Sequence, residues 1–197
     1  MNSQFLRPAF DNPVDSAQQG FRIALKAISE PGLTHELGLV AELDSLAPAT
    51  YALALTLFDS DTTVWLSPSL DTPAVRANLA FHCACPITGQ AQEADFALML
   101  ASEVDAITLL NNGTDRDPEL SCTALVQLDS LEGGQPTTWQ GPGIETQRTV
   151  VLPVETAFWQ NRQAVTKFPC GIDMYFIAGE RIMALPRSTQ VNFQQEN

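Results

Sequence analysis

Short runs of β-branched and aromatic residues alternate along this chain with segments of helical periodicity, and no other feature constrains the fold as strongly. Residues 62–66 (TTVWL) are typical of a buried strand. Residues 14–29 place apolar side chains at helical spacing, and Pro31 and Gly32 then end the helix. Strands that alternate with helices are typical of a sheet covered by helices. The sequence therefore predicts an α/β sandwich around one mostly buried sheet.

The same patterns assign most of the chain to helices or strands. We expect helices over residues 14–29, 48–58, 72–81, 104–110 and 155–167, and strands over residues 33–40, 62–66, 96–101, 123–128, 137–140, 172–178 and 181–185. Gly179 and Glu180 separate the last two strands and indicate a hairpin, so the sheet should be mixed. No linker or repeat interrupts residues 1–197, which predicts a single domain with flexible segments at residues 1–13 and 192–197.

Hydrophobic residues make up 45% of the chain and charged residues 17%, which allows a substantial core without disulfides. The four cysteines form no CxxC motif, so we expect free thiols in a reducing compartment. The N-terminal residues lack the apolar run of a signal peptide, and the longest apolar stretches are too short to span a bilayer. These features predict a cytoplasmic protein without a membrane segment.

The formal net charge of −13 is distributed unevenly along the chain. Such a charge repels nucleic acid and anionic membrane surfaces, so neither is expected as a general partner. Residues 92–132 hold nine acids and one base, whereas residues 162–187 hold four bases and two acids. Eight of the ten cations are arginines, whose planar guanidinium suits bidentate contacts with phosphate. An anionic ligand would therefore find its most favourable stretch near the C-terminus.

The closing segment, FPCGIDMYFIAGERIMALPRST (residues 168–189), contains the most suggestive site residues. Arg187, Ser188 and Thr189 follow a stiff proline and offer a guanidinium and two hydroxyls, which are groups that bind phosphate oxygens. Asp173, at the start of the preceding strand, could orient an arginine. The alternative interpretation is a sheet edge closed by a surface turn.

A second cluster of polar residues, Asp59 and Asp61, lies between a predicted helix and a buried strand. Two carboxylates this close could act as an acid–base pair, hold an arginine or bind a divalent ion. A polar turn that caps the flanking elements explains them equally well. Calcium-loop spacing is absent, and we expect no metal here.

His82 ends a predicted helix in the stretch FHCACP (residues 81–86) and is a candidate general acid or base. A helix-terminal histidine that simply hydrogen-bonds carbonyls is the alternative. Zinc is not expected, because Cys83 and Cys85 have unusual spacing and no second Cys/His pair lies nearby.

Arg22 and Lys26 lie one helical turn apart on one predicted helix, where they could meet an anion or simply form a solvated face. The sequence contains no dinucleotide fingerprint, no P-loop and no GxSxG motif. Neither of the two lysines, Lys26 and Lys167, has a context that demands a Schiff base.

Taken together and in order, several of these stretches are similar to the H subunit family of the bacterial carbon–phosphorus lyase system (PhnH). The stretches that carry the resemblance are Gly20-Phe21-Arg22, Ser29-Glu30-Pro31-Gly32, Thr56-Leu57, Asp59-x-Asp61-Thr62-x-Val64-Trp65-Leu66, Phe81-His82 with Pro86, Gly133-Gly134, Gly141-Pro142-Gly143-Ile144, FP-x-GID with GERI, and ALPRST. Each motif is weak alone, but the ordered set covers residues 14–191 with compatible spacing.

The resemblance implies a fold like the large domain of pyridoxal-phosphate-dependent transferases, without that cofactor, and a tendency to form homodimers. It also implies assembly with core subunits G, I and J. Together with other components, such complexes make α-D-ribose 1-methylphosphonate 5-triphosphate from ATP and an alkylphosphonate. Phosphonate and nucleotide or ribose phosphate are therefore the expected ligands.

Two functions remain open for such a subunit. In the first, the chain binds substrate or contributes to catalysis, and the expected residues are His82, Asp59 and Asp61 for catalysis and Arg22, Asp173, Arg187, Ser188 and Thr189 for phosphate binding. In the second, the chain is a non-catalytic assembly subunit whose acidic residues 92–132 steer a basic partner.

Overall fold

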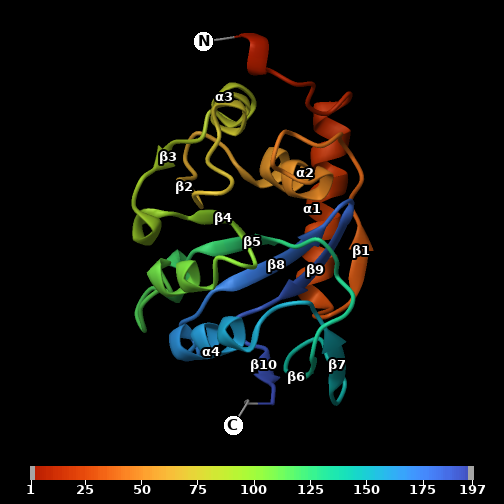
Figure 1. Ribbon diagram of the computed structural model, residues 1–197, viewed down its shortest axis with the longest axis vertical. Helices are drawn as coiled ribbons and strands as arrows, with labels where there is room; N and C mark the ends of the chain where they lie inside the picture. The colour runs from red at the N-terminus through yellow and green to blue at the C-terminus, as the bar shows by residue number, and fades with distance from the viewer. Residues whose placement is uncertain (1–2, 195–197) are drawn as a thin grey trace.

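A mixed sheet of seven strands forms the centre of the computed structural model, which describes residues 3–194 (Figure 1). Its strand order is β1-β9-β8-β5-β4-β2-β3. The strands are β1 (Thr34–Glu36), β2 (Val64–Leu66), β3 (Ile87–Thr88), β4 (Phe96–Leu100), β5 (Thr123–Gln127), β8 (Asp173–Ala178) and β9 (Arg181–Leu185). The pairs from β3 through β2, β4 and β5 to β8 are parallel, whereas β9 is antiparallel to both β8 and β1.

A second, antiparallel sheet lies at the end of the molecule where the C-terminus is found (Figure 1). Its order is β10-β6-β7, with β6 (Pro136–Gln140), β7 (Arg148–Val151) and β10 (Gln190–Asn192). Val191 of β10 pairs with Trp139 of β6, and Trp139 is fully buried. The small sheet therefore holds the residues that follow the closing segment in a defined position.

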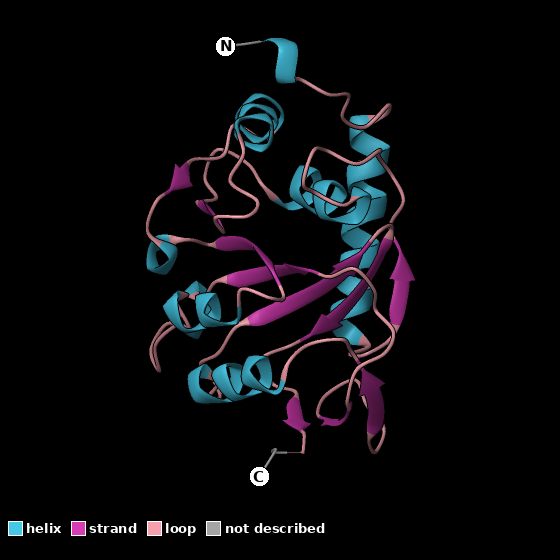
Figure 2. Cartoon of the chain, in the orientation of Figure 1, coloured by secondary structure: helices cyan, strands magenta, loops and turns pink. Residues whose placement is uncertain are grey.

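Helices cover both faces of the central sheet (Figure 2). The α-helices are α1 (Pro13–Ser29), α2 (Pro48–Leu57), α3 (Pro73–His82) and α4 (Thr156–Val165). The 3₁₀ helices are Ser3–Phe5, Ala91–Glu93, Val104–Leu109 and Pro118–Leu120. The side chain of Asn12 accepts a hydrogen bond from the Asp15 N–H and caps α1, and Thr72 caps α3 in the same way through Val75.

The central strands are buried on both faces, and their side chains alternate between two separate core clusters. In β5, Leu125 packs with α1, α2 and α3, whereas Ala124 and Val126 pack with α4 and the small sheet. In β8, Tyr175 joins the first cluster and Phe176 the second. This two-residue period is what a strand buried on both faces requires.

The predicted α/β class and the mixed sheet are confirmed. The prediction of one sheet is wrong, because β6, β7 and β10 form a second sheet, and neither β7 nor β10 was predicted. The predicted helix over residues 104–110 is a 3₁₀ helix. The strand predicted over residues 33–40 is shorter in the structure, where β1 ends at Glu36. The next residue, Leu37, is fully buried, and its N–H donates to the carbonyl of Glu180.

The segment before α1 is attached to α3. The Arg7 N–H donates to Asn78 Oδ1 over 2.8 Å, and Asn78 Nδ2 donates to the carbonyl of Phe5. Part of the expected flexibility concerned residues 1, 2 and 195–197, which lie outside the described residues. Within residues 3–194, no helix is long and apolar enough to cross a membrane.

Phe176 tests the second core cluster, because its fully buried ring lies 5.6 Å from that of Phe158, centroid to centroid. We expect Phe176→Ala to lower the free energy of unfolding by about 3–5 kcal/mol, since the cavity cannot collapse completely. Phe168→Ala is the matched control and should change it by no more than about 0.5 kcal/mol, because the Phe168 side chain is 73% exposed. Urea denaturation measures both, and equal effects would contradict this description of the core.

Candidate functional site

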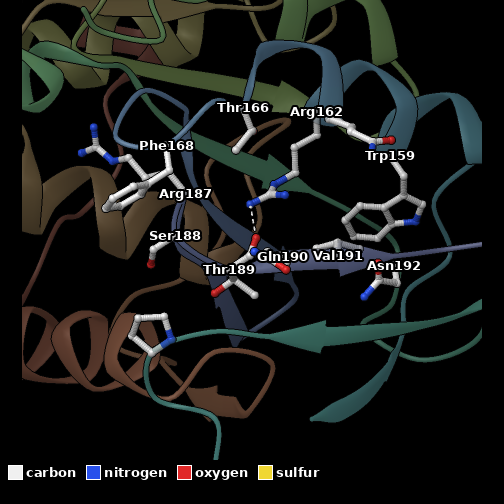
Figure 3. Close-up of a pocket in the computed structure, with 12 residues that line it drawn as sticks. Trp159, Arg162, Thr166, Phe168, Arg187, Ser188, Thr189, Gln190, Val191 and Asn192 are labelled. Carbon is white, nitrogen blue, oxygen red and sulfur yellow. Dashed lines mark hydrogen bonds between the residues drawn. The ribbon is translucent and has the colours of Figure 1, made fainter. Parts of the chain in front are cut away.

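A cavity of about 560 Å³ lies between α4 and the end of the closing segment (Figure 3). The residues that line it are Pro142, Trp159, Arg162, Gln163, Thr166, Phe168, Arg187, Ser188, Thr189, Gln190, Val191 and Asn192. Strand β8 begins at Asp173, and β9 ends opposite it, where Leu185 pairs with Met174. The cavity therefore lies at the amino-terminal edge of the parallel strands.

This location differs from the usual one, since open α/β sheets more often bind ligands beyond the carboxyl ends of their strands. At the carboxyl end of β5, the side chain of Gln127 is already engaged. Its amide oxygen accepts hydrogen bonds from the Ala47 N–H and the Thr50 hydroxyl, and its Nε2 donates to the carbonyl of Ser45. A smaller cavity of about 330 Å³ lies at this edge, but none of the described residues in its wall is Arg or Lys, whereas two arginines line the cavity at the opposite edge.

Arg187 enters the wall of the cavity in a fixed orientation. Its Nη2 lies 2.9 Å from Asp173 Oδ2, its Nε donates to the same oxygen over 3.1 Å, and its backbone N–H donates to Asp173 Oδ1 over 2.7 Å. Its Nη1 donates to the carbonyl of Pro118. Asp173 thus orients Arg187 and also neutralises its charge.

Thr189 and Ser188 complete the turn that begins at Pro186. The Thr189 N–H donates to the Pro186 carbonyl over 3.0 Å and closes the turn. The Thr189 hydroxyl is buried and has no hydrogen-bond partner among the described residues. Ser188 is half-buried and lines the same cavity. Ser188 is therefore open to a ligand, and the buried Thr189 hydroxyl has no partner among the described residues that a ligand would have to displace.

Arg162 of α4 is the cation that sequence reasoning missed as a site residue. It is only 4% exposed, and its Nη2 donates to the carbonyl of Pro186 over 3.1 Å. The same Nη2 donates to the carbonyl of Thr189 over 3.1 Å (Figure 3). Burial lowers the pKa of Arg162 to about 10, which still leaves the guanidinium charged at neutral pH. Phe158, Trp159 and Arg162 are the buried residues of α4. Their helical spacing is the signal that would have placed Arg162 on the inner face.

The rest of the cavity wall is half polar, with Gln163, Thr166, Gln190 and Asn192, and half apolar. Trp159 and Val191 contribute to the apolar half from α4 and β10, and Pro142 and Phe168 contribute from loops. The cavity thus combines a cationic side with an apolar side, and its size suits a small organic anion.

The other predicted site residues lie elsewhere. Asp59 Oδ1 accepts the Asp61 N–H over 2.9 Å, and the Thr62 hydroxyl accepts the Asp59 N–H over 2.8 Å, so this stretch forms an exposed, self-capped turn. It precedes β2, which lies three strands from β8, or roughly 14 Å along the sheet. His82 ends α3, and its Nε2 lies 3.0 Å from the carbonyl oxygen of Arg7.

Arg22 is exposed on α1 and lines a separate, shallow groove with Lys26 and His35. The structure therefore brings together Asp173, Arg187, Ser188 and Thr189 of the predicted residues and adds Arg162 to them. It places Arg22, His82, Asp59 and Asp61 outside the cavity.

All four cysteines are buried free thiols. Within residues 3–194, no three side chains of His, Cys, Asp or Glu gather into a cluster that could hold a metal ion. The lysines that might hold a carbonyl cofactor, Lys26 and Lys167, are both exposed.

Fold and cavity together define an α/β protein with an anion-compatible pocket at the amino-terminal edge of its parallel strands. Residues 8–192 match the family described as bacterial phosphonate metabolism protein (PhnH). The chain therefore belongs to the PhnH family.

Two relatives support this assignment. The chain is 36% identical over 195 residues to the α-D-ribose 1-methylphosphonate 5-triphosphate synthase subunit PhnH of Rhizobium meliloti (strain 1021), and the match covers 96% of each protein. It is 26% identical over 84 residues to a protein of Stutzerimonas stutzeri provisionally named C-P lyase subunit protein HtxG, covering 42% of this chain and 43% of the relative. The family extends along nearly the whole chain, including all residues that line the cavity.

The ion pair of Arg187 and Asp173 can be tested by a double-mutant cycle. We expect Arg187→Met and Asp173→Asn each to lower the free energy of unfolding by about 1–3 kcal/mol, since each leaves a partly buried charge without its partner. The free energy of unfolding of the double mutant should fall by clearly less than the sum of the two single-mutant losses. The reason is that the second substitution removes a group that is already unpaired. Strictly additive losses in urea denaturation would show that the two side chains are not coupled.

Proposed function

We propose that this chain is an H-type subunit that acts with core subunits G, I and J to form α-D-ribose 1-methylphosphonate 5-triphosphate from ATP and an alkylphosphonate. The cavity between α4 and the closing segment would bind part of a phosphonate, nucleotide or ribose phosphate ligand. The similarity to the subunit of R. meliloti along 96% of both chains supports the assignment to such a complex. The cavity, with its cationic and apolar sides, is the observation that favours a ligand-binding role.

The proposal also includes a structural relationship to a known fold and a cellular location. The parallel strands of a mixed sheet, covered by helices, support a relationship to the large domain of pyridoxal-phosphate-dependent transferases, here without that cofactor. The proposed substrate ATP places the transferase complex in the cytoplasm.

A non-catalytic assembly role is the second candidate, and a specific surface favours it. Asp115 and Glu119 are exposed and lie, with Asp117, in one loop at the amino-terminal edge of the sheet. Such an acidic loop suits a basic partner. In this case the cavity would hold the turn in place without binding substrate.

Filling the cavity separates the two candidates. In the reconstituted complex, we expect Ser188→Phe to abolish formation of the ribosylated phosphonate, because the ring occupies the space of the ligand. Co-purification with the other subunits should be unchanged, and phosphorus NMR measures the product.

Ser69→Phe is the matched control, since Ser69 is exposed in the turn after β2 and lines neither this cavity nor the one at the carboxyl edge of the sheet, and this variant should retain full activity. Normal product formation by the Ser188→Phe complex would instead support the assembly role.

A homodimer is also part of the proposal, and the outer face of α1 supports it. Val14, Phe21 and Leu25 are 66%, 49% and 50% exposed, and their spacing places them in one stripe along the helix. When two copies of α1 pair antiparallel about a two-fold axis, Val14 of each faces Leu25 of the other. Arg22 and Asp15 of opposite copies then come close enough to attract each other.

We expect Phe21→Glu to convert the dimer into a monomer, because it places a charge in the middle of this stripe. Phe81→Glu is the matched control, since Phe81 is 54% exposed on α3, and it should leave the dimer intact. Light scattering after size-exclusion chromatography measures the mass. An unchanged mass for Phe21→Glu would remove α1 from the dimer interface.

A further inference from the structure

Several buried polar atoms without partners gather around the cavity. Side chains of the described residues with such atoms are His35, Ser45, Tyr51, Ser67, Ser121, Arg162, Thr166 and Thr189. Three of them, Arg162, Thr166 and Thr189, line the one cavity between α4 and the closing segment. Buried polar atoms are rarely left without a hydrogen bond, so a group of three around one cavity requires an explanation.

The charge inside this cavity is also only partly compensated, because Asp173 acts on Arg162 at a distance and not through an ion pair. Arg187 is neutralised by Asp173, but Arg162 forms no ion pair within residues 3–194, and only the carbonyls of Pro186 and Thr189 accept its hydrogen bonds. Its Nε is buried without a partner. A charge held in a low-dielectric interior gains strongly from an opposite charge nearby.

The residues that line the cavity determine the sign of the ligand. No Asp, Glu, His or Lys is among them, so the two arginines are its only titratable side chains. The guanidinium of Arg162 and the hydroxyls of Thr166 and Thr189 offer donors, as bound phosphate oxygens require. A cation would meet no carboxylate here.

We propose that Arg162, Thr166 and Thr189 form a site for one phosphate or phosphonate oxyanion, whose organic substituent lies against Trp159 and Phe168. This inference deepens the proposed function and rests on its premise that the cavity binds a ligand. It assigns the anion to Arg162 and gives Arg187 a positioning role, because the hydrogen bonds of Arg187 to Asp173 and Pro118 are already formed.

A purely structural role for Arg162 explains less. Its two hydrogen bonds to the turn account for Nη2 alone. They do not explain why Arg162 Nε and the hydroxyls of Thr166 and Thr189 are buried without a hydrogen-bond partner. If Thr166 and Thr189 only filled space, valine would serve at either position, because its side chain has the same shape as that of threonine and no polar atom.

The test uses the intact chain, titrated calorimetrically with inorganic phosphate, methylphosphonate and ATP in separate experiments. We expect at least one of them to bind, and the tightest identifies the source of the oxyanion. Thr189→Val and Thr166→Val should each weaken that binding at least about tenfold. Their melting temperatures without ligand should stay equal or rise, because each removes a buried hydroxyl without a partner.

Two further variants complete the design. Arg162→Lys keeps the charge but loses the planar fork, and it should also weaken binding. Ser121→Ala removes a buried hydroxyl without a partner outside the cavity, and it should leave the affinity unchanged. Absence of binding by all three anions, or unchanged affinity in both valine variants, would overturn the proposal.

The outcome is separable from that of the proposed function. If no anion binds the chain while Ser188→Phe inactivates the complex, the oxyanion site is wrong and the proposed function stands. If the variants behave as expected while Ser188→Phe leaves the complex active, the oxyanion site stands and its use in the reaction is wrong.

Discussion

Burial of the central strands on both faces is the constraint on which the rest of this structure depends. Because β5 and β8 are covered on both sides, the chain must supply two separate layers. The first layer consists of α1, α2 and α3, and the second of α4, the Val104–Leu109 helix and the small sheet. The second layer also creates the cavity, since α4 and β10 cover the sheet at the edge where β8 begins and β9 ends.

Arg162 connects this layer to the closing turn. Burying a guanidinium without a carboxylate is unfavourable unless other groups interact with its charge. The carbonyls of Pro186 and Thr189 satisfy part of this requirement and at the same time fix the turn. Asp173 fixes the other side of the same turn through Arg187. The turn is thus held by two arginines of different character, one neutralised and one still able to attract an anion.

Much of the fold could be predicted from the sequence because the long strands and helices have clear periodicity. The segments β3 and β10 were not predictable, because β3 has only two residues and β10 has a single apolar residue, Val191. The equally short β2 was predictable because it lies in the apolar, β-branched run TTVWL. The closing turn was found as a candidate site because its residues are consecutive. His82 and Asp59 were grouped with it through their residue types and the family resemblance, but the order of the strands separates Asp59 from it, and His82 ends α3 elsewhere. Arg162 was not included because its helical spacing with Phe158 and Trp159, which places it on the inner face of α4, was not used.

The position of Arg162 in the cavity bears on how the chain would work. A net charge of −13 repels a polyanion such as ATP at long range, and the exposed carboxylates of Asp115 and Glu119 at the same edge of the sheet add to this effect. A triphosphate requires several cations, whereas the cavity offers the guanidinium of Arg162. The chain alone is therefore suited to one oxyanion group, and in the proposed complex the remaining positive charge would come from partner subunits. This requirement favours a subunit that functions inside a complex over one that captures a nucleotide alone.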